Sequence, residues 1–267
     1  MKNSKSILEI RRNRIFKQLQ EAGTVKVDDL VNELKVSALT IRRDLDYLAS
    51  KNLAERFYGG ASLSTKIINS SSLVLNKDNQ NYALHKHAIA KKAAEFVEEG
   101  DTLFINTSST ALLLIKYIRN KRVNIITNNG KAIFMDHDPN VLIVLSGGEL
   151  RIPKESMTGE FAINNLSKVT ATKSFIGVSG ITPDTGITTS ILPEVAINEL
   201  MISRVTGPTF IMADSSKIGK ESTFVSGKID QLTYLITDTD ADPQAVARLK
   251  GKGLRVLQVE PLKQLDS

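Results

Sequence analysis

The stretch VSALTIRRDLDYLAS, residues 36–50, decides the fold of the first part of the chain. Ser37 is a good N-cap, because its side chain can accept a hydrogen bond from the first turn of a helix. Three apolar residues then recur at the spacing i, i+4, i+7, which places them on one buried stripe: Ile41, Leu45 and Leu48. The sequence therefore predicts a helix that begins after Ser37 and packs along this stripe.

Two adjacent arginines, Arg42 and Arg43, lie in the middle of this helix. At about 100° per residue both point away from the buried stripe, with Leu39 between them. Ser37 and Thr40 lie near the N-terminal end, which recognition helices present to the base edges of DNA. Because neither packing nor solubility requires the arginine pair, we interpret this face as one that binds a polyanion.

The preceding segments predict the partner of this helix. An apolar pattern at residues 6–22 predicts a first helix, and TVKV at residues 24–27 predicts a short extended piece. DDLVNELK, residues 28–35, predicts a second helix with acidic residues in its first turn, where they complement the helix dipole. Two helices joined by a tight turn, the second carrying the arginine face, form a helix-turn-helix.

The segment LAERFYGGASL, residues 53–63, alternates in part and contains a Gly-Gly pair. We interpret it as a β-wing, with Arg56 and Tyr58 available to the phosphate backbone of DNA. The alternative is a three-helix protein-interaction module whose arginines pair with Asp44 and Asp46. That alternative explains neither the wing nor the Ser/Thr/Arg face.

The composition is that of an ordinary globular protein, with 41% hydrophobic and 24% charged residues. The absence of cysteine excludes disulfides and thiolate metal sites, and three histidines among 267 residues argue against a His-rich metal site. We expect neither a metal nor a cofactor. No apolar run approaches the ~18 residues of a membrane span, and the N-terminus lacks the apolar core of a signal peptide. We therefore expect a cytoplasmic protein without a membrane partner.

The net charge of +6 is unevenly distributed. Residues 1–60 contain 12 Lys/Arg and 8 Asp/Glu, a net charge of +4, and the remaining 207 residues hold +2. A basic head on a nearly neutral body is typical of polyanion binding, although a solvated surface with extra lysines is the alternative. We place a winged helix-turn-helix domain at residues 1–61 and expect double-stranded DNA as its partner.

A second domain follows a Ser- and Asn-rich segment, residues 62–80, which we interpret as a linker. Residues 85–98 predict a helix. Beyond it, seven near-continuous apolar runs alternate with helical stretches: 102–106, 123–127, 141–148, 174–181, 209–214, 234–238 and 254–259. Such runs are typical of parallel strands covered on both faces. Residues 81–267 therefore predict an α/β domain with an open, mostly parallel sheet.

Polar loops follow five of these strands, at residues 107–110, 128–129, 147–151, 179–189 and 214–217. In open α/β sheets, ligands bind beyond the carboxyl ends of the strands. Hydroxyls and backbone N–H groups at helix N-termini suit an anion, and Lys217 would add the compensating charge. We expect a phosphorylated polyol or sugar there, with Ser/Thr-rich turns that bind nothing as the alternative.

The motif at residues 36–61 resembles the DNA-binding signature of the DeoR family of bacterial transcriptional regulators, and the body resembles the sensor domain of that family. Our candidate DNA-binding residues are Ser37, Leu39, Thr40, Arg42, Arg43, Arg56 and Tyr58. Our candidate effector-binding residues are Thr107, Ser108, Ser109, Thr110, Asn128, Gly147, Gly148, Arg151, Gly180, Glu194, Asp214 and Lys217.

The resemblance implies a sensor domain similar in fold to ribose-phosphate isomerases and glucosamine-phosphate deaminases. It also implies a phosphorylated sugar effector that alters DNA binding, and a homo-oligomer, either a dimer or a tetramer. The expected function is a sequence-specific transcriptional regulator, a repressor of a sugar-metabolism operon. One departure concerns the first loop, where Ser108 stands at a position that is Gly in many members.

Two other functions stay open at this point. The first is a sugar-phosphate isomerase or deaminase with a DNA-binding head, which would need a carboxylate base close to the sugar carbons. Glu194 and Asp184 are the candidates for that base, but each is as easily a surface residue, and we assign no catalytic residue. The second is an architectural DNA-binding protein that responds to no effector, which the polar loops argue against.

Overall fold

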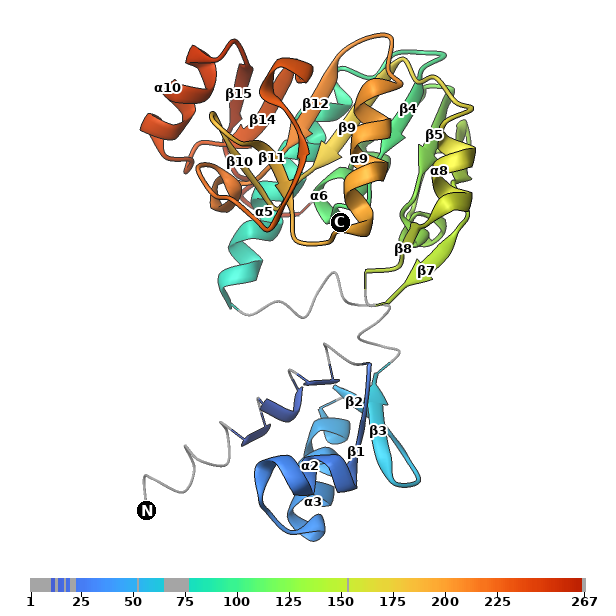
Figure 1. The fold of residues 1–267 in the computed structure, drawn as a ribbon, viewed down its shortest axis with the longest axis vertical. Helices are drawn as coiled ribbons and strands as arrows, with labels where there is room; N and C mark the ends of the chain where they lie inside the picture. Colours follow the sequence, from blue (N-terminus) through green and yellow to red (C-terminus); the bar gives the residue numbers. More distant parts are fainter. Residues whose placement is uncertain are drawn as a thin grey trace. The chain divides into compact units, whose positions relative to one another are not determined.

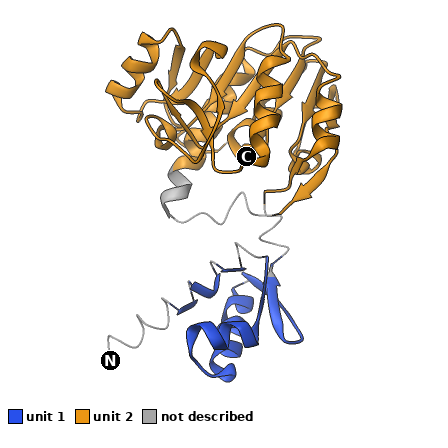
Figure 2. Ribbon diagram, viewed as in Figure 1, with its two compact units in different colours: residues 1–80 blue, residues 81–267 orange. Residues whose placement is uncertain are grey.

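The computed structural model describes residues 11–265, except for residues 13, 17, 20–22, 52, 65–76 and 153. The chain divides into two compact units, residues 1–80 and residues 81–267 (Figure 2). Most of the segment predicted as a linker lies outside the described residues, so its boundaries stay a prediction. None of the described helices is both long and apolar enough to cross a membrane.

The first unit contains the predicted helix-turn-helix and wing. Residues 11–12, 14–16 and 18–19 are helical, and they are followed by β1 (Thr24–Lys26), α2 (Val27–Leu34), α3 (Ala38–Ser50), β2 (Ala54–Phe57) and β3 (Gly60–Leu63). The three strands form an antiparallel sheet in the order β1-β3-β2. A shared core joins the helices to this sheet: Ile15, Leu19, Val25, Val27, Leu30, Ile41, Leu45, Leu48, Ala54 and Ala61.

A seven-stranded parallel sheet forms the centre of the second unit (Figure 1). Its order is β15-β14-β12-β9-β4-β5-β6. All seven predicted strands are present, as β4 (Thr102–Ile105), β5 (Val123–Thr127), β6 (Val141–Leu145), β9 (Lys173–Gly177), β12 (Thr209–Met212), β14 (Tyr234–Asp238) and β15 (Arg255–Val259). From β4 the chain adds β5 and β6 toward one edge of the sheet, and from β9, the neighbour of β4, it adds β12, β14 and β15 toward the other edge. The direction of winding therefore reverses between β4 and β9.

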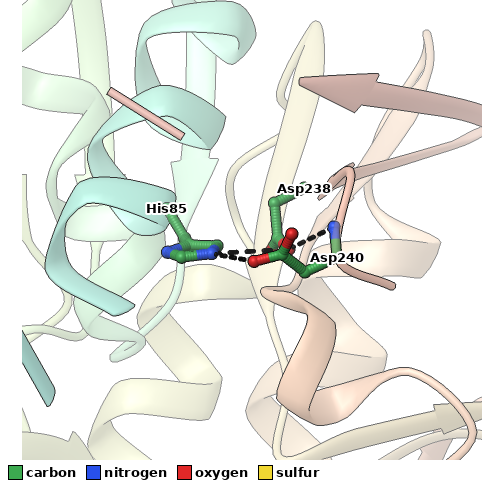
Figure 3. Close-up of side chains that lie close together, drawn as sticks. All are labelled: His85, Asp238 and Asp240. Carbon is green, nitrogen blue, oxygen red and sulfur yellow. Dashed lines mark hydrogen bonds and ion pairs between the residues drawn. The ribbon is translucent and has the colours of Figure 1, made fainter. Parts of the chain in front are cut away.

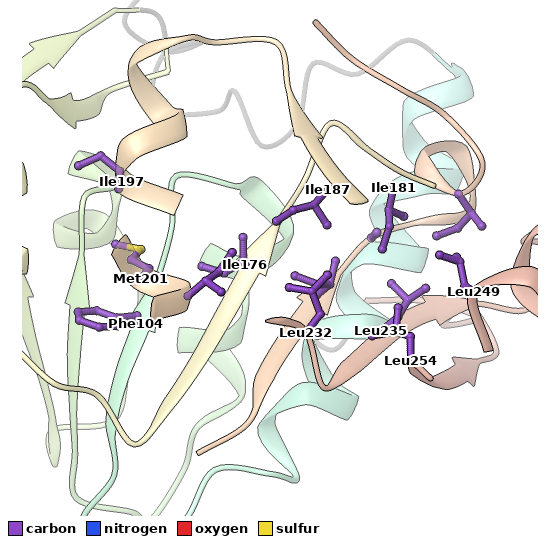
Figure 4. Close-up of a cluster of buried hydrophobic side chains, with 14 of the residues drawn as sticks. Phe104, Ile176, Ile181, Ile187, Ile197, Met201, Leu232, Leu235, Leu249 and Leu254 are labelled. Atoms are coloured by element: carbon purple, nitrogen blue, oxygen red, sulfur yellow. The ribbon is translucent and has the colours of Figure 1, made fainter. Parts of the chain in front are cut away.

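Two hydrophobic clusters cover the two faces of this sheet. One joins the strands to α8 (Glu160–Leu166), α9 (Pro193–Ser203) and α10 (Pro243–Gly251), as shown for part of it in Figure 4. The other joins them to α5 (Lys77–Ala94), α6 (Ser109–Leu112) and α7 (Leu114–Tyr117). The prediction of an α/β sheet covered on both faces is therefore confirmed. Short 3-10 turns complete the unit at η1 (Gly130–Phe134), η2 (Ser215–Lys217) and η3 (Ile229–Gln231).

Two predicted strands, 141–148 and 174–181, end three and four residues earlier than expected, and each is followed by strands outside the main sheet. The apolar run at 174–181 divides into β9 and β10 (Gly180–Thr182), which pairs with β11 (Gly186–Thr189), and β11 pairs with β13 (Phe224–Gly227). The run at 141–148 ends at Leu145 and leads into the hairpin of β7 (Glu149–Arg151) and β8 (Ser156–Thr158). The β10–β11 hairpin forms because paired Ile181 and Ile187 are both buried in the core.

The helix predicted at residues 85–98 is displaced toward the N-terminus, because α5 spans Lys77–Ala94. Its start was missed because residues 77–84 carry no helical apolar period. Its end comes early because the N–H groups of residues 95–97 bond to carbonyls three residues back, which tightens the last turn.

Candidate functional site

The N-terminal end of α3 is fixed by Ser37, as the sequence predicts. The Ser37 side chain accepts a hydrogen bond of 3.2 Å from the backbone N–H of Thr40, and the two hydroxyl oxygens lie 2.9 Å apart. Ile41, Leu45 and Leu48 are buried along one side of the helix, as expected. The capping bond therefore presents the Ser37 and Thr40 hydroxyls together at the end of a helix whose other side is anchored in the core.

The exposed face of α3 carries the two arginines. Arg42 and Arg43 are exposed, Leu39 is 57% exposed, and neither arginine side chain has a partner among the residues that the structure describes. The alternative pairing with Asp44 and Asp46 is not formed, because those carboxylates bind other arginines. The arginine pair is therefore free to bind phosphate or base edges, which suits DNA recognition.

Asp44 is buried in this unit, although the sequence pattern did not predict its burial. Its carboxylate accepts hydrogen bonds from Arg11 at 2.6 Å and from Arg12 at 2.8 Å. The Arg12 guanidinium also lies 3.7 Å from the centre of the Tyr47 ring. These contacts fasten the N-terminal helical segment to α3 and so fix the orientation of α3.

The wing places its two candidate residues differently. Tyr58 lies in the turn between β2 and β3 and is fully exposed. Arg56 donates a hydrogen bond of 3.2 Å to the backbone oxygen of Arg42 and pairs with Asp46 at 3.2 Å. Arg56 therefore braces the wing against α3.

In the second unit a cavity of about 490 Å³ lies at the carboxyl ends of the central strands. It is lined by the loops that follow β4, β5, β9 and β12, so it spans the position where the winding of the sheet reverses. This is where ligands bind in open α/β sheets, and the volume is that of a small-molecule site. Its lining is polar apart from Leu112, Val178 and Gly177.

A smaller recess of about 60 Å³ shares one end of this cavity. Residues 108–110, Lys86, Asp214 and Lys217 line it. The Ser108 side chain caps the turn that follows, accepting bonds from the N–H groups of residues 110 and 111. The recess joins hydroxyls, two ammonium groups and the Asp214 carboxylate, so its ammonium groups outnumber its carboxylates, which suits a compact anion such as phosphate.

Ser108 also explains the glycine that faces it. A Cβ on Gly177 would lie 1.8 Å from the Ser108 hydroxyl oxygen, so no other residue fits there while Ser108 keeps this position. The departure from the Gly of many related loops is therefore accommodated by close packing against β9. The serine is an integral part of the recess wall.

Lys86 is a lining residue that the sequence pattern did not single out. Burial lowers the pKa of Lys86, and the positive charge of Lys217 lowers it further. The Asp214 carboxylate, 4.0 Å from the Lys86 ammonium, has the opposite effect. Such a lysine is destabilised in its charged form until an anion arrives. A lysine among others on a helix is most simply interpreted as solvated, which is why it was missed.

The residue next to it, His85, holds the same helix in place (Figure 3). Its Nε2 lies 2.7 Å from an Asp240 oxygen and 3.8 Å from an Asp238 oxygen. Asp238 in turn accepts hydrogen bonds from the backbone N–H groups of Ser215 and Asp240. These three side chains are close enough to one another to hold a cation. However, His85 bonds directly to Asp240, and both Asp238 oxygens already accept backbone hydrogen bonds. We therefore interpret the three side chains as a clamp between α5 and the loop after β14.

Glu194 lines the larger cavity and is not part of the small recess. It is buried, and its two oxygens accept hydrogen bonds from the hydroxyls of Thr107 at 3.0 Å and Thr189 at 3.1 Å. Lys154 lies 4.0 Å away. Next to them, the Asn106 amide bonds both backbone groups of Gly177, which holds the β4 and β9 loops together.

Seven of the twelve candidate effector residues line the cavity or its recess: Thr107, Ser108, Ser109, Thr110, Glu194, Asp214 and Lys217. The other five do not: Asn128, Gly147, Gly148, Arg151 and Gly180. Arg151 is exposed on β7, and Gly180 lies within β10. Gly148 has a structural role, because its φ is +109° and a Cβ would meet the Thr158 carbonyl oxygen at 2.5 Å. Asn128 is buried and donates to the backbone oxygen of Met157, so Asn129 lines the cavity in its place.

The two candidate bases are also distinguished by their surroundings. Asp184 lies on the surface, where it pairs with Arg248 at 2.7 Å and Lys252 at 3.5 Å, and it is not among the residues that line the cavity. Glu194 lines the cavity. Both of its oxygens are already engaged, so its geometry is that of a group that orients hydroxyls.

Comparison with known proteins agrees with this architecture. The model of the DeoR-like helix-turn-helix domain matches residues 11–66, and that of the DeoR C-terminal sensor domain matches residues 81–239. A lactose phosphotransferase system repressor of Streptococcus mutans is 33% identical over 237 residues, which cover 88% of this chain and 93% of that protein. A repressor of the same name from Staphylococcus aureus is 29% identical, with coverage of 90% and 95%.

The likeness to solved structures is distant. Ribose 5-phosphate isomerase A from Methanocaldococcus jannaschii is 17% identical to this chain. The match covers 51% of this chain and 54% of that one, with a TM-score of 0.36. The two domain matches and the long relative in S. mutans decide the assignment: this chain belongs to the DeoR family of helix-turn-helix transcriptional regulators.

Proposed function

We propose that this DeoR-family regulator is a repressor of a sugar-metabolism operon and that a phosphorylated sugar modulates its binding to operator DNA. The observation that carries the proposal is the cavity at the reversal point of the sheet. One end of it combines the capped 108–110 turn with Lys86 and Lys217, and the remainder is lined by hydroxyls, amides and Glu194. Ammonium groups suit a phosphate, and the polar lining suits sugar hydroxyls.

The relatives support the repressor part of this proposal. Two long relatives carry the name lactose phosphotransferase system repressor. The ligand class, a phosphorylated sugar, is proposed from the lining of the cavity.

We also propose that the protein acts as a homo-oligomer. A helix-turn-helix unit reads one half-site, and dimers read two half-sites about one helical turn apart. Exposed apolar side chains on the edge strand β6 and nearby segments support self-association: Ile133, Phe134, Leu142, Val144, Leu150 and Ile152.

A mobility-shift titration tests the sensor. Lys217→Ala removes an ammonium group from the recess, so the variant should still bind operator DNA but need at least about tenfold more sugar phosphate for the same response. Lys220→Ala is the matched control, since Lys220 is exposed on the same loop and does not line the cavity. An unaltered protein that ignores every sugar phosphate would contradict the proposal. Identical responses of both variants would place the anion elsewhere.

The alternative is an isomerase or deaminase, which the buried carboxylate of Glu194 in the cavity keeps open. A base must reach a proton on a sugar carbon. The hydroxyls of Thr107 and Thr189 occupy both oxygens of Glu194, which favours recognition of ligand over proton abstraction. Turnover of aldose or ketose phosphates by the full chain would support the enzyme instead.

A further inference from the structure

The cavity carries more positive charge than its own carboxylates balance. Four lysines line it: Lys86, Lys131, Lys154 and Lys217. Asp214 lies 4.0 Å from Lys86, and Glu194 lies 4.0 Å from Lys154. The side chains of Lys131 and Lys217 have no hydrogen-bond or ion-pair partner within the described part of the chain. Two lysines therefore remain for a ligand.

Lys131 is held in position by the loop that follows β5. The Asn129 side chain accepts a hydrogen bond of 3.1 Å from the backbone N–H of Lys131, and the N–H of Gly130 donates to the Glu155 carbonyl at 2.8 Å. Lys131 is half-buried and lines the cavity. A half-buried lysine on a braced turn, without a carboxylate partner among the residues that the structure describes, is arranged to meet an anion from outside the chain.

The two unpaired lysines belong to opposite ends of the cavity. Lys217 follows β12 and Lys131 follows β5, and the sheet order between them is β12-β9-β4-β5. Neighbouring strands are about 4.8 Å apart, so three steps separate the two loops by about 14 Å. The small recess lies at the Lys217 end and does not include Lys131. An anion seated in the recess therefore leaves Lys131 facing the rest of the cavity.

We propose that the ligand of this cavity is a sugar with an anionic group at each end, namely a sugar bisphosphate. One phosphate occupies the recess with Lys86 and Lys217, and Lys131 binds the second. Glu194 and the hydroxyls that surround it lie between, where sugar hydroxyls would pass. This inference rests on the proposed function, since it assumes that the recess holds a phosphate.

Calorimetric titration of the full chain tests this proposal by comparing the monophosphates and the bisphosphate of the same sugar. For fructose and glucose, the 1-phosphate, the 6-phosphate and the 1,6-bisphosphate are compared. The bisphosphate should bind at least about tenfold more tightly than either monophosphate, which is the lower range for one charge-assisted hydrogen bond. Lys131→Met should remove that advantage and leave monophosphate binding within about threefold, whereas Lys217→Met should weaken both ligand types.

Controls separate this inference from the proposed function. Lys131→Arg keeps the charge and should retain most of the bisphosphate advantage, and Lys220→Met, which lies outside the cavity, should change nothing. Melting temperatures of the ligand-free variants check that each folds.

Monophosphate binding without any bisphosphate advantage overturns the two-anion site and leaves the sensor in place. No binding of any sugar phosphate overturns both. If 6-phosphogluconate binds as tightly as the bisphosphate, and Lys131→Met weakens that binding, the two-anion site is supported with a carboxylate as the second anionic group.

Discussion

Lys86 shows how one partly buried residue can link ligand binding to pH. Its pKa lies below the ordinary lysine value of about 10.4, mainly through burial, and an anion in the recess would favour the charged form. The bound protein then has a higher Lys86 pKa than the free protein. Between these two values, binding takes up a proton, so affinity for the anion falls as pH rises.

We therefore expect the affinity for a hexose 6-phosphate to weaken as the pH rises through the lowered pKa of Lys86 in the free protein. The phosphate itself does not titrate in that alkaline range, because its second pKa is about 6. Calorimetry in two buffers of different ionisation enthalpy measures the proton uptake directly. Lys86→Arg is the matched control, since a guanidinium stays charged throughout this range and should abolish the uptake. Identical pH profiles for the two proteins would show that Lys86 does not meet the anion.

The arginine pair makes a second prediction at the scale of single residues. Arg42→Ala or Arg43→Ala should weaken operator binding by about 1–3 kcal/mol if the lost contact is to a base. A contact to phosphate alone should weaken specific and non-specific DNA alike and flatten the salt dependence by about one unit. Fluorescence anisotropy with operator and scrambled duplexes at several salt concentrations distinguishes these outcomes. Unchanged binding of both variants would exclude α3 as the recognition element.

Among the elements, α3 depends on a buried ion cluster as well as on its apolar stripe. The Asp44 side chain is 2% exposed and binds Arg11 and Arg12, whereas Asp46, two residues later on the same helix, is 65% exposed and binds Arg56. Removing one partner from a buried cluster leaves uncompensated charge, while an exposed pair contributes little.

Asp44→Ala should therefore lower the free energy of unfolding of the first unit by about 3–5 kcal/mol, and Asp46→Ala by less than about 1 kcal/mol. Denaturant titration followed by the fluorescence of a probe attached within residues 36–61 reports on that unit. Equal losses for the two variants would mean that the Arg11 and Arg12 contacts do not stabilise the helix-turn-helix.

For the whole molecule, sequence reasoning succeeded where one physical pattern dominates. The seven parallel strands could be predicted because buried strands are nearly continuous apolar runs, and α3 because its cap and apolar stripe agree. The β10–β11 and β7–β8 hairpins were missed because they lie in Ser-, Thr- and Gly-rich segments whose polar character also suits ligand loops. Their strands depend on pairing and on burial of a few side chains, such as Ile181 and Ile187.

The cavity was only partly predictable for a related reason. Loop residues directly after strands, such as Ser108 and Lys217, are placed at one sheet end by topology alone. Lys86, Lys131 and Lys154 reach the cavity from a helix, a 3-10 turn and a hairpin, whose placement depends on tertiary packing. Gly148 was assigned to the ligand, but its backbone angle and close contact account for it without one.

The last prediction concerns the two units acting as one molecule. If a sugar phosphate weakens operator binding by some factor, operator DNA must weaken sugar-phosphate binding by the same factor, because the four binding steps form a closed cycle. Couplings of about 1–3 kcal/mol are usual, which corresponds to about 5- to 150-fold. Calorimetry with and without operator duplex gives one factor, and anisotropy with and without sugar phosphate gives the other. A scrambled duplex at the same salt concentration controls for non-specific charge. A sugar phosphate that binds the cavity tightly yet leaves operator affinity unchanged would show that occupancy of the second unit does not regulate the first.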